Sequence, residues 1–361
     1  LICELLELVV TRNTFSFDNK HPRILYVDNT GRDGRWIGDD IFTLPMLQSL
    51  WSVADIDILT TKTRKVIYDN QTYIKEIFTA LEQPWAHYDH ILLLRRSFRK
   101  FHFIFKKLWL IWFTQKALLS TYSNRFIEDK HLNHIELAHK WVQDVIPILP
   151  DLTNFTPHIQ LTDYIKTFGR SYVQQYGSEN NITIAVGNKD PRRDYKALHH
   201  TISLLAKTYP TYTFFLVGDE SWLRQENQID QRKNVVCCSA KFTLEQSFGI
   251  ISATQAAVWF DSGLANAAIA LDVPTYVIYN IVYPEERVPQ DATHVTTLDI
   301  WCDEKCYYTT SPHICHKTTS STPDCLETYS PFDLYNNIIS WIDQLWNEEY
   351  KLQKNRTHEA L

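Results

Sequence analysis

Short apolar segments rich in β-branched residues alternate along the chain with polar loops and segments of helical period, which restricts the chain to an α/β fold. A first series has such apolar segments at 23–28, 56–59 and 90–94. A second series begins after Gly177 and has them at 181–186, 212–217, 235–236, 256–260 and 275–279. Continuous apolar runs of this length are typical of strands buried on both faces of a parallel sheet. We therefore predict two doubly wound, Rossmann-like domains that face a cleft, with ligands beyond the carboxyl ends of the strands.

The chain length of 361 residues agrees with two domains. We predict an N-terminal domain over 1–170 and a C-terminal domain over 171–361, the latter with a cysteine-bearing loop at 301–326. Helices are expected at 41–51, 131–148, 196–208 and 336–345.

Charge and apolar content exclude several classes of protein. The net charge of −6 argues against a nucleic-acid-binding surface along the whole chain. The apolar run at 103–113 contains Lys106 and Lys107 and falls short of the roughly 20 residues that cross a membrane. The apolar segment 1–10 contains two glutamates and no basic region, so we do not expect a signal peptide. Four of the seven cysteines lie in one short stretch, unlike a secreted disulfide framework, and we predict a cytoplasmic protein.

A glycine-rich loop at 29–40 follows the first strand and precedes the first helix. Its glycines permit the backbone conformations that a tight, ligand-facing loop needs. Asp39 and Asp40 stand at the expected start of the helix. One interpretation is that a carboxylate caps the helix. The other is a general base that removes a proton from a hydroxyl, and the spacing does not choose between the two.

Three basic residues, Lys189, Arg192 and Arg193, follow the first strand of the second series. Arginine binds phosphate through paired hydrogen bonds and lysine as a point charge, so this loop suits a diphosphate. The alternative is a solvated basic loop.

The segment 259–274 places Asp261, Ser262 and Gly263 between an apolar strand and a helix of small residues. Unpaired backbone N–H groups and the dipole at the helix start favour a phosphate. Ser262 can donate a further hydrogen bond, and we expect Asp261 to accept one from a sugar hydroxyl. A separate pattern, Thr243-Leu-Glu-Gln246, predicts a capping box at a helix start, with a contact to the edge of a nucleotide as a second role.

Four cysteines in the predicted loop have metal-ligand residue types: Cys302, Cys306, Cys315 and Cys325. Four thiolates suit a structural zinc or iron ion, although the spacing is not that of paired Cys-x2-Cys motifs. His313 or His316 can replace a thiolate in this interpretation, and free or partly oxidised cysteines are the alternative.

The segment 95–119 is basic, aromatic and helical in period. We interpret it as a surface helix with an apolar underside. The alternative is a peripheral contact with an anionic membrane surface, where Lys, Arg and Trp are favoured.

In this order, the motifs resemble the glycosyltransferase family of the bacterial lipopolysaccharide heptosyltransferases. Ile37–Leu47 is similar to the Gly-Asp-x5-Pro helix start of that family, and Asp39 falls on its catalytic base. The segment 260–274 is similar to its Asp-Ser/Thr-Gly motif with a small-residue helix and Val-Pro. The resemblance covers most of the chain from Arg23 to Trp346.

The resemblance implies a B-type glycosyltransferase fold with an acceptor-side N-terminal domain and a C-terminal domain that binds a nucleotide diphosphate-sugar. It implies inverting transfer without a required metal, with ADP-heptose as donor and a saccharide, lipid-linked or protein acceptor, as in lipopolysaccharide core biosynthesis. Some relatives that modify proteins carry iron in a cysteine finger. The implied donor-binding residues are Lys189, Arg192, Arg193, Thr243, Asp261, Ser262, Gly263 and Asn266.

The chain departs from the family pattern at three places. Asn266 stands where the family has a histidine, the basic loop lacks its tryptophan, and the segment 279–284 replaces a Gly-Pro-Thr-type loop. Two alternatives follow: a nucleotide-sugar 2-epimerase, which needs no external acceptor, and a non-catalytic saccharide-binding protein with a decayed site.

Overall fold

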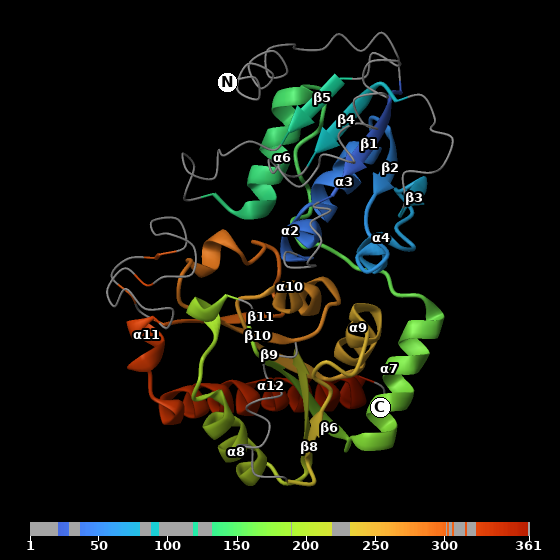
Figure 1. Cartoon of the computed structure of the whole chain (residues 1–361). Coiled ribbons are helices and arrows are strands. Elements are labelled where there is room, and N and C mark those ends of the chain that lie inside the picture. The colour runs from blue at the N-terminus through green and yellow to red at the C-terminus, as the bar shows by residue number, and fades with distance from the viewer. Residues whose placement is uncertain are drawn as a thin grey trace.

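The computed structural model contains two parallel β-sheets, each flanked by helices (Figure 1). It describes residues 21–28, 37–79, 88–93, 118–121, 132–188, 190–218, 232–300, 302, 305–306, 315 and 323–359, and all that follows concerns these residues. The upper part in Figure 1 holds the first sheet and the lower part the second, and helices α2 and α10 lie where the two parts meet. The predicted α/β class with two Rossmann-like sheets is confirmed.

The first sheet has five strands in the order β3-β2-β1-β4-β5, all paired in parallel. The helices α2 and α3 follow β1, and α6 follows β5. The bounds of the elements in this half are β1 Arg23–Val27, α2 Ile37–Phe42, α3 Leu44–Trp51, β2 Asp55–Leu59, α4 Lys65–Tyr68, β3 Glu76–Phe78, β4 His90–Leu93, β5 Leu118–Thr121 and α6 His134–Val145.

The second sheet has six strands in the order β11-β10-β9-β6-β7-β8, again all parallel. The bounds in this half are α7 Asp163–Tyr176, β6 Asn180–Val186, η3 Pro191–Arg193, α8 Leu198–Thr208, β7 Tyr212–Gly218, β8 Val235–Cys237, α9 Leu244–Ala253, β9 Ala256–Phe260, α10 Gly263–Ala270, β10 Thr275–Tyr279, η6 Pro284–Glu286, β11 Val295–Asp299, α11 Asp324–Glu327 and α12 Pro331–Glu359.

Alternate residues of the second sheet pack against helices on opposite faces, which is why its strands read as continuous apolar runs. Ile184, Val258 and Ile278 share a cluster with residues of α8 and α12. Trp259 and Val277 point the other way, into a cluster with α7, α9 and α10. Both faces of this sheet are therefore buried under helices.

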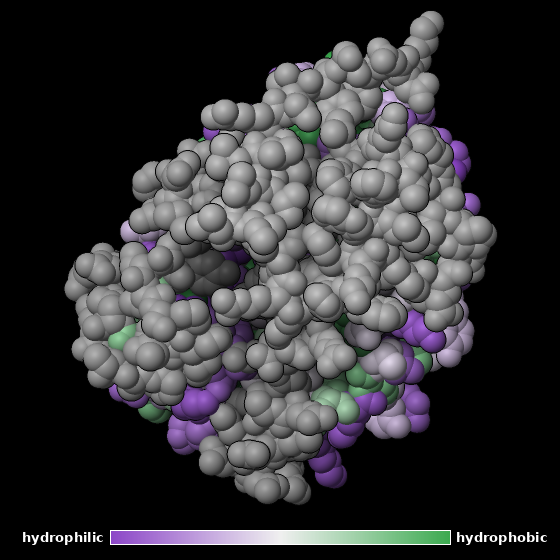
Figure 2. Space-filling view, turned by 45° about the horizontal axis from the view of Figure 1, so that its top comes forward, coloured by the Kyte–Doolittle hydropathy of each residue, from purple (hydrophilic) through white to green (hydrophobic). Residues whose placement is uncertain are grey.

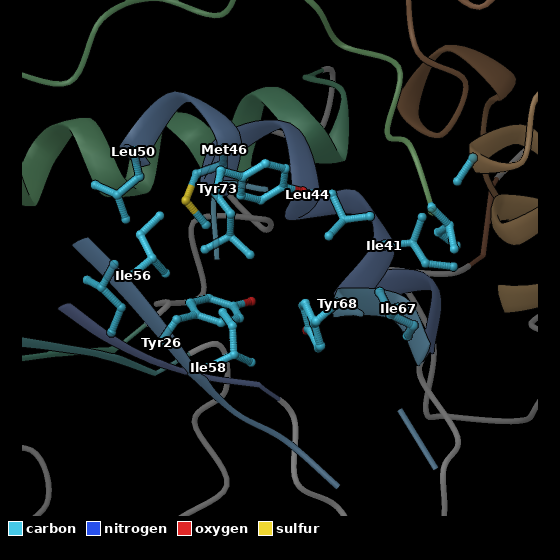
Figure 3. Close-up of a cluster of buried hydrophobic side chains, with 14 of the residues drawn as sticks. Tyr26, Ile41, Leu44, Met46, Leu50, Ile56, Ile58, Ile67, Tyr68 and Tyr73 are labelled. Atoms are coloured by element: carbon cyan, nitrogen blue, oxygen red, sulfur yellow. The ribbon is translucent and has the colours of Figure 1, made fainter. Parts of the chain in front are cut away.

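The core of the first sheet extends into the second half of the chain. Figure 3 shows Tyr26, Ile56 and Ile58 of the strands packed beneath Met46 and Leu50 of α3. The same buried cluster continues through Phe248 of α9 and through Ala267 and Ala270 of α10. Because apolar burial stabilises in proportion to the area removed from water, this shared core holds the two halves together.

Several elements were not predicted from the sequence. The strands β3 and β11 are short edge strands whose residues are partly or largely exposed, so they lack an apolar run. Helix α7 crosses the predicted division at residue 170 and packs on α9 through Gly169 and Gly249, while the division itself stays a prediction. The prediction of a helix through residue 119 is wrong at its end, since 118–121 form β5; 95–117 lie outside the described residues.

None of the helices in the described part of the chain combines the length and the apolar character needed to cross a membrane.

Candidate functional site

Helix α2 of the first half and helix α10 of the second half are in contact where the two halves of the molecule join. A Cβ atom on Gly263 would lie 2.3 Å from Cγ1 of Ile37 and 3.1 Å from the backbone nitrogen of Gly38. A Cβ atom on Gly38 would lie 2.5 Å from Nδ2 of Asn266. Only residues without a side chain permit so close an approach. The glycines of α2 and α10 thus bring the Gly38-Asp39 pair to the start of α10.

The two carboxylates of α2 have different environments. Asp40 is fully buried, and its Oδ2 lies 3.0 Å from Nη1 of the buried Arg64. Asp39 is partly exposed in the first turn of the helix. Since α2 begins at Ile37, neither residue is the N-cap, and the capping interpretation of these residues is wrong. The environment separates a structural carboxylate, Asp40, from one that remains accessible, Asp39.

A third carboxylate, Asp28, lies at the end of β1 and is buried. It accepts a hydrogen bond from the hydroxyl of Thr60. Burial raises the pKa of Asp28 to about 6, although the hydrogen bond from Thr60 and the charge of Arg64 act to lower it. Asp28 and Asp40 are therefore two buried carboxylates close to Arg64.

The basic loop is held by its own carboxylate, Asp190. All three guanidinium nitrogens of Arg192 donate: Nε to Oδ1 of Asp190 at 3.1 Å, Nη2 to Oδ2 of Asp190 at 2.9 Å, and Nη1 to the Cys306 carbonyl at 3.1 Å. These bonds give Arg192 a supporting position in the loop, and its phosphate contact stays a prediction. Lys189 lies outside the described residues.

Arg193 and the Asp261 turn form one unit. Nη1 of Arg193 lies 2.9 Å from Oδ2 of Asp261, and both side chains are buried. The side chain of Asn188 donates to the Asp261 carbonyl at 3.2 Å. Two motifs far apart in the sequence, the basic loop and the turn after β9, are therefore joined.

The helix after this turn is capped as its residue types suggest. Ser262 is the N-cap of α10, and its hydroxyl accepts a hydrogen bond from the Ala265 N–H at 3.2 Å. Asn266 is buried one turn further on, against Gly38.

The predicted capping box of α9 is confirmed: Thr243 accepts from the Gln246 N–H at 3.2 Å, and the Gln246 side chain accepts from the Thr243 N–H at 3.1 Å. The donor contacts of these residues stay predictions.

On the face of the molecule in Figure 2, the coloured residues along the lower part are mostly hydrophilic, with a few hydrophobic residues among them.

No protein-family model and no curated protein matches this sequence. Solved structures do match. The ADP-heptose lipopolysaccharide heptosyltransferase II of Escherichia coli superimposes with a TM-score of 0.65 at 16% identity, over 91% of this chain and 99% of that one. A family 9 glycosyltransferase from Veillonella parvula gives a TM-score of 0.62 at 14% identity, over 78% and 86% of the two chains. The iron-containing dodecameric glycosyltransferase TibC from enterotoxigenic Escherichia coli gives 0.60 at 11% identity, over 92% and 78%.

The chain has the B-type glycosyltransferase fold. The resemblance drawn from the sequence motifs is thereby confirmed at the level of the fold. In this fold the contact of α2 with α10 lies between the two Rossmann-like halves, so the predicted base and the predicted donor turn belong to two helices that touch each other.

Four cysteines, Cys302, Cys306, Cys315 and Cys325, lie near one another, and the carbonyl of Cys306 accepts a hydrogen bond from Arg192 of the basic loop. Burial raises the pKa of Cys325 to about 11, and the neighbouring thiols of Cys302, Cys306 and Cys315 also raise it. The Asn280 side chain donates to the Arg192 carbonyl at 2.7 Å and lies 3.7 Å from Sγ of Cys325. Among the described residues, no group of three His, Cys, Asp or Glu side chains is arranged to hold a metal ion. His313 and His316 lie outside those residues.

Two residues at this junction were missed by the sequence analysis. His134 begins α6, and its Nδ1 accepts from Nη1 of Arg287 at 2.5 Å. The His134 ring also packs edge-on against Phe42 of α2, with centroids 5.7 Å apart. Burial lowers the pKa of His134 well below its ordinary value, and the charges of Arg287 and Arg193 lower it further. No local motif marks these residues, because only the packing of the two halves brings them together.

Proposed function

We propose that this protein is an inverting glycosyltransferase that transfers heptose from ADP-heptose to a saccharide or protein acceptor, as in lipopolysaccharide core biosynthesis. The observation that supports the proposal is the close contact of α2 with α10, in which Gly38, the chain neighbour of Asp39, approaches Gly263. Two of the similar structures support it by their names, the ADP-heptose lipopolysaccharide heptosyltransferase II of Escherichia coli and the glycosyltransferase TibC.

Asp39 is the proposed general base. Its carboxylate would accept the proton of the acceptor hydroxyl while the hydroxyl oxygen attacks the anomeric carbon. The new bond forms on the face opposite the bond to the diphosphate, so the configuration inverts. The partial exposure of Asp39 supports this role, since a base must reach an acceptor that arrives from solvent.

The donor side is proposed to lie over the start of α10. The backbone N–H groups of Ser262 and Gly263 and the helix dipole suit the diphosphate. Arg193 would add positive charge where negative charge grows on the leaving nucleotide. Asp261 forms an ion pair with Arg193 and so holds the guanidinium in position. Lys189 is proposed as a further diphosphate contact, Arg192 as a support of the loop, and Thr243 and Asn266 as contacts at the edge of the donor.

In the described part of the chain no three His, Cys, Asp or Glu side chains are arranged around a metal position, and no step of the proposed reaction is assigned to a metal. We propose separately that a structural zinc or iron ion holds the cysteine-bearing loop, bound by Cys302, Cys306, Cys315 and Cys325. Its test is the metal content of the purified protein, expected near one ion per chain and lost in Cys325→Ser. Absence of metal from protein purified without chelator would contradict it.

A cytoplasmic location is proposed with this function, at the inner face of the cytoplasmic membrane if the acceptor is lipid-linked. The basic segment 95–119 is the proposed contact. Its binding to anionic vesicles should weaken with added salt, because salt screens exposed charges.

The test of the function is incubation with ADP-heptose while free ADP and the sugar products are followed. The proposal expects ADP release that increases with a saccharide acceptor and produces a glycosylated product. Conversion of the sugar to an isomer without acceptor would indicate an epimerase instead. Donor binding with neither release nor product would indicate a non-catalytic binding protein.

A further inference from the structure

The loop after β10 contains a buried arginine at the junction of the two halves. Strands β9 and β10 are parallel neighbours, with Phe260 opposite Ile278. The Asp261 turn and the loop that runs from Asn280 through η6 therefore leave the same edge of the sheet. This loop leads to Arg287, of which 4% is exposed. In a doubly wound sheet, loops at this edge are the ones that meet ligands.

Residues of the other half hold this guanidinium in place. Nη1 of Arg287 donates to Nδ1 of His134 at 2.5 Å, and its Cζ lies 5.9 Å from the centre of the Phe42 ring. Phe42 stands three residues after Asp39 in α2, so the two side chains lie on neighbouring positions of one helix surface. Arg287 is thus positioned between the helix of the proposed base and the edge of the second sheet.

The α6 start is itself tied to this loop. The Asn133 side chain donates to the Glu285 carbonyl at 3.0 Å and to the Val288 carbonyl at 2.7 Å. These bonds fix the backbone on both sides of Arg287. A side chain held by its backbone and by a neutral imidazole acceptor is preorganised, which is what a binding group for a growing charge requires.

A second guanidinium lies close by. Nη1 of Arg193 is 2.9 Å from Oδ2 of Asp261. The charges of Arg287 and Arg193 both lower the pKa of His134. Both charges also lower the pKa of Tyr279, which burial and the charge of Asp261 raise. Asp261 offsets part of this positive charge, and a diphosphate bound beside the two arginines would offset more of it.

We propose that Arg287 is a second cationic ligand of the donor diphosphate, acting with Arg193, and that His134 is its positioning residue. This inference rests on the proposed function. When the bond between the anomeric carbon and the diphosphate oxygen breaks, its electron pair stays on that oxygen, and Arg287 and Arg193 stabilise the charge. The acceptor oxygen forms the new bond, and its proton passes to Asp39.

The test measures binding by calorimetry for the wild type, Arg287→Met, Arg287→Lys and the control Arg170→Met. Arg170 is exposed on α7, so its replacement removes the same charge away from the site. The ligands are inorganic pyrophosphate, ADP and adenosine. Arg287→Met should weaken pyrophosphate and ADP about 10- to 100-fold and leave adenosine unchanged, as expected for loss of a charged hydrogen bond. Arg287→Lys should fall between, and Arg170→Met should bind as the wild type does.

Equal losses for ADP and adenosine, or no loss for either phosphate ligand, would overturn the inference. So would a higher KM for the acceptor with unchanged pyrophosphate affinity, which would assign Arg287 to the acceptor. If Arg287→Met does not fold, the same ligand comparison in Arg287→Lys decides. If the wild type binds ADP and Arg287→Met binds it with the same affinity, this inference alone is wrong. If the wild type binds neither phosphate ligand, the proposed function is wrong as well.

Discussion

At the scale of single residues, burial decides what each carboxylate near α2 does. Asp40 pairs with Arg64, which comes from the start of α4, and is sealed from solvent. Asp39 is its neighbour in the chain and stays partly exposed. The sequence could point to both residues through the Gly-Asp-Asp motif. It could not separate them, because the partner that buries Asp40 belongs to another element.

This difference gives a matched pair of variants. Asp39→Asn should lower kcat about 100- to 10,000-fold, since a general base is lost, with little change in donor affinity or in the free energy of unfolding. Asp40→Asn should instead lower the free energy of unfolding by about 3 kcal/mol, because it removes the carboxylate that forms a buried ion pair with Arg64. Turnover assays and urea unfolding measure the two effects. Full activity in Asp39→Asn would remove that residue from the proposed mechanism.

Asp28 predicts a pH dependence of stability. Its pKa is raised from 3.8 to about 6 in the folded protein, first by burial. At pH values below the pKa of Asp28 in the unfolded chain, the carboxyl group is protonated in both the folded and the unfolded state, so its ionisation does not change the free energy of unfolding. As pH rises toward 6 the unfolded chain releases its proton first, so the ionisation of Asp28 progressively favours unfolding, on the order of 3 kcal/mol in full.

Asp28→Asn removes this penalty. The difference in the free energy of unfolding between Asp28→Asn and the wild type should therefore shift in favour of the variant between about pH 4 and pH 6. Urea unfolding at several pH values measures it. A difference that stays constant across this range would show that Asp28 has no raised pKa.

At the scale of elements, helix α7 was not predicted from the sequence although it packs closely on α9. It has only three buried positions, Ile165, Gly169 and Val173, spaced four apart. The stripe is narrow because α7 meets α9 backbone to backbone: a Cβ on Gly169 would lie 1.8 Å from the carbonyl oxygen of Gly249. Phe168, Tyr172 and Val173 still pack into the core at helical spacing, so the sequence does carry an amphipathic pattern for this helix that we did not use. The buried strands, by contrast, were predicted because their successive residues are buried, which gives continuous apolar runs.

The contact predicts that Gly169→Ala is destabilising although alanine favours helices. The added methyl group overlaps backbone, which cannot yield as a flexible side chain does, so the free energy of unfolding should fall by about 3 kcal/mol. Thr167→Ala, at an exposed position of the same helix, should change it by less than about 0.5 kcal/mol. Chemical denaturation of both variants measures this, and equal stability would mean that the helices do not approach so closely.

At the scale of the whole molecule, the candidate site depends on how the two halves meet. The sequence motifs identified the helix start at Gly38 and the turn at Asp261 separately, and the family resemblance joined them. The contacts of His134 with Arg287, and of Gly38 with Asn266, exist only in the packed molecule. No local pattern encodes which loop of one half reaches which helix of the other, so this part of the site could not be predicted.

The measurement that tests the central claim most directly is thermal stabilisation of the purified protein by ADP, GDP, UDP and CDP in parallel. A ligand that binds only the folded state at 100 times its Kd adds about 2.7 kcal/mol of stability. The proposed function predicts a clear rise in Tm with ADP and smaller rises with the other three. If none of the four raises Tm at millimolar concentration, the cleft does not bind a nucleoside diphosphate, and the protein is not a glycosyltransferase of this kind.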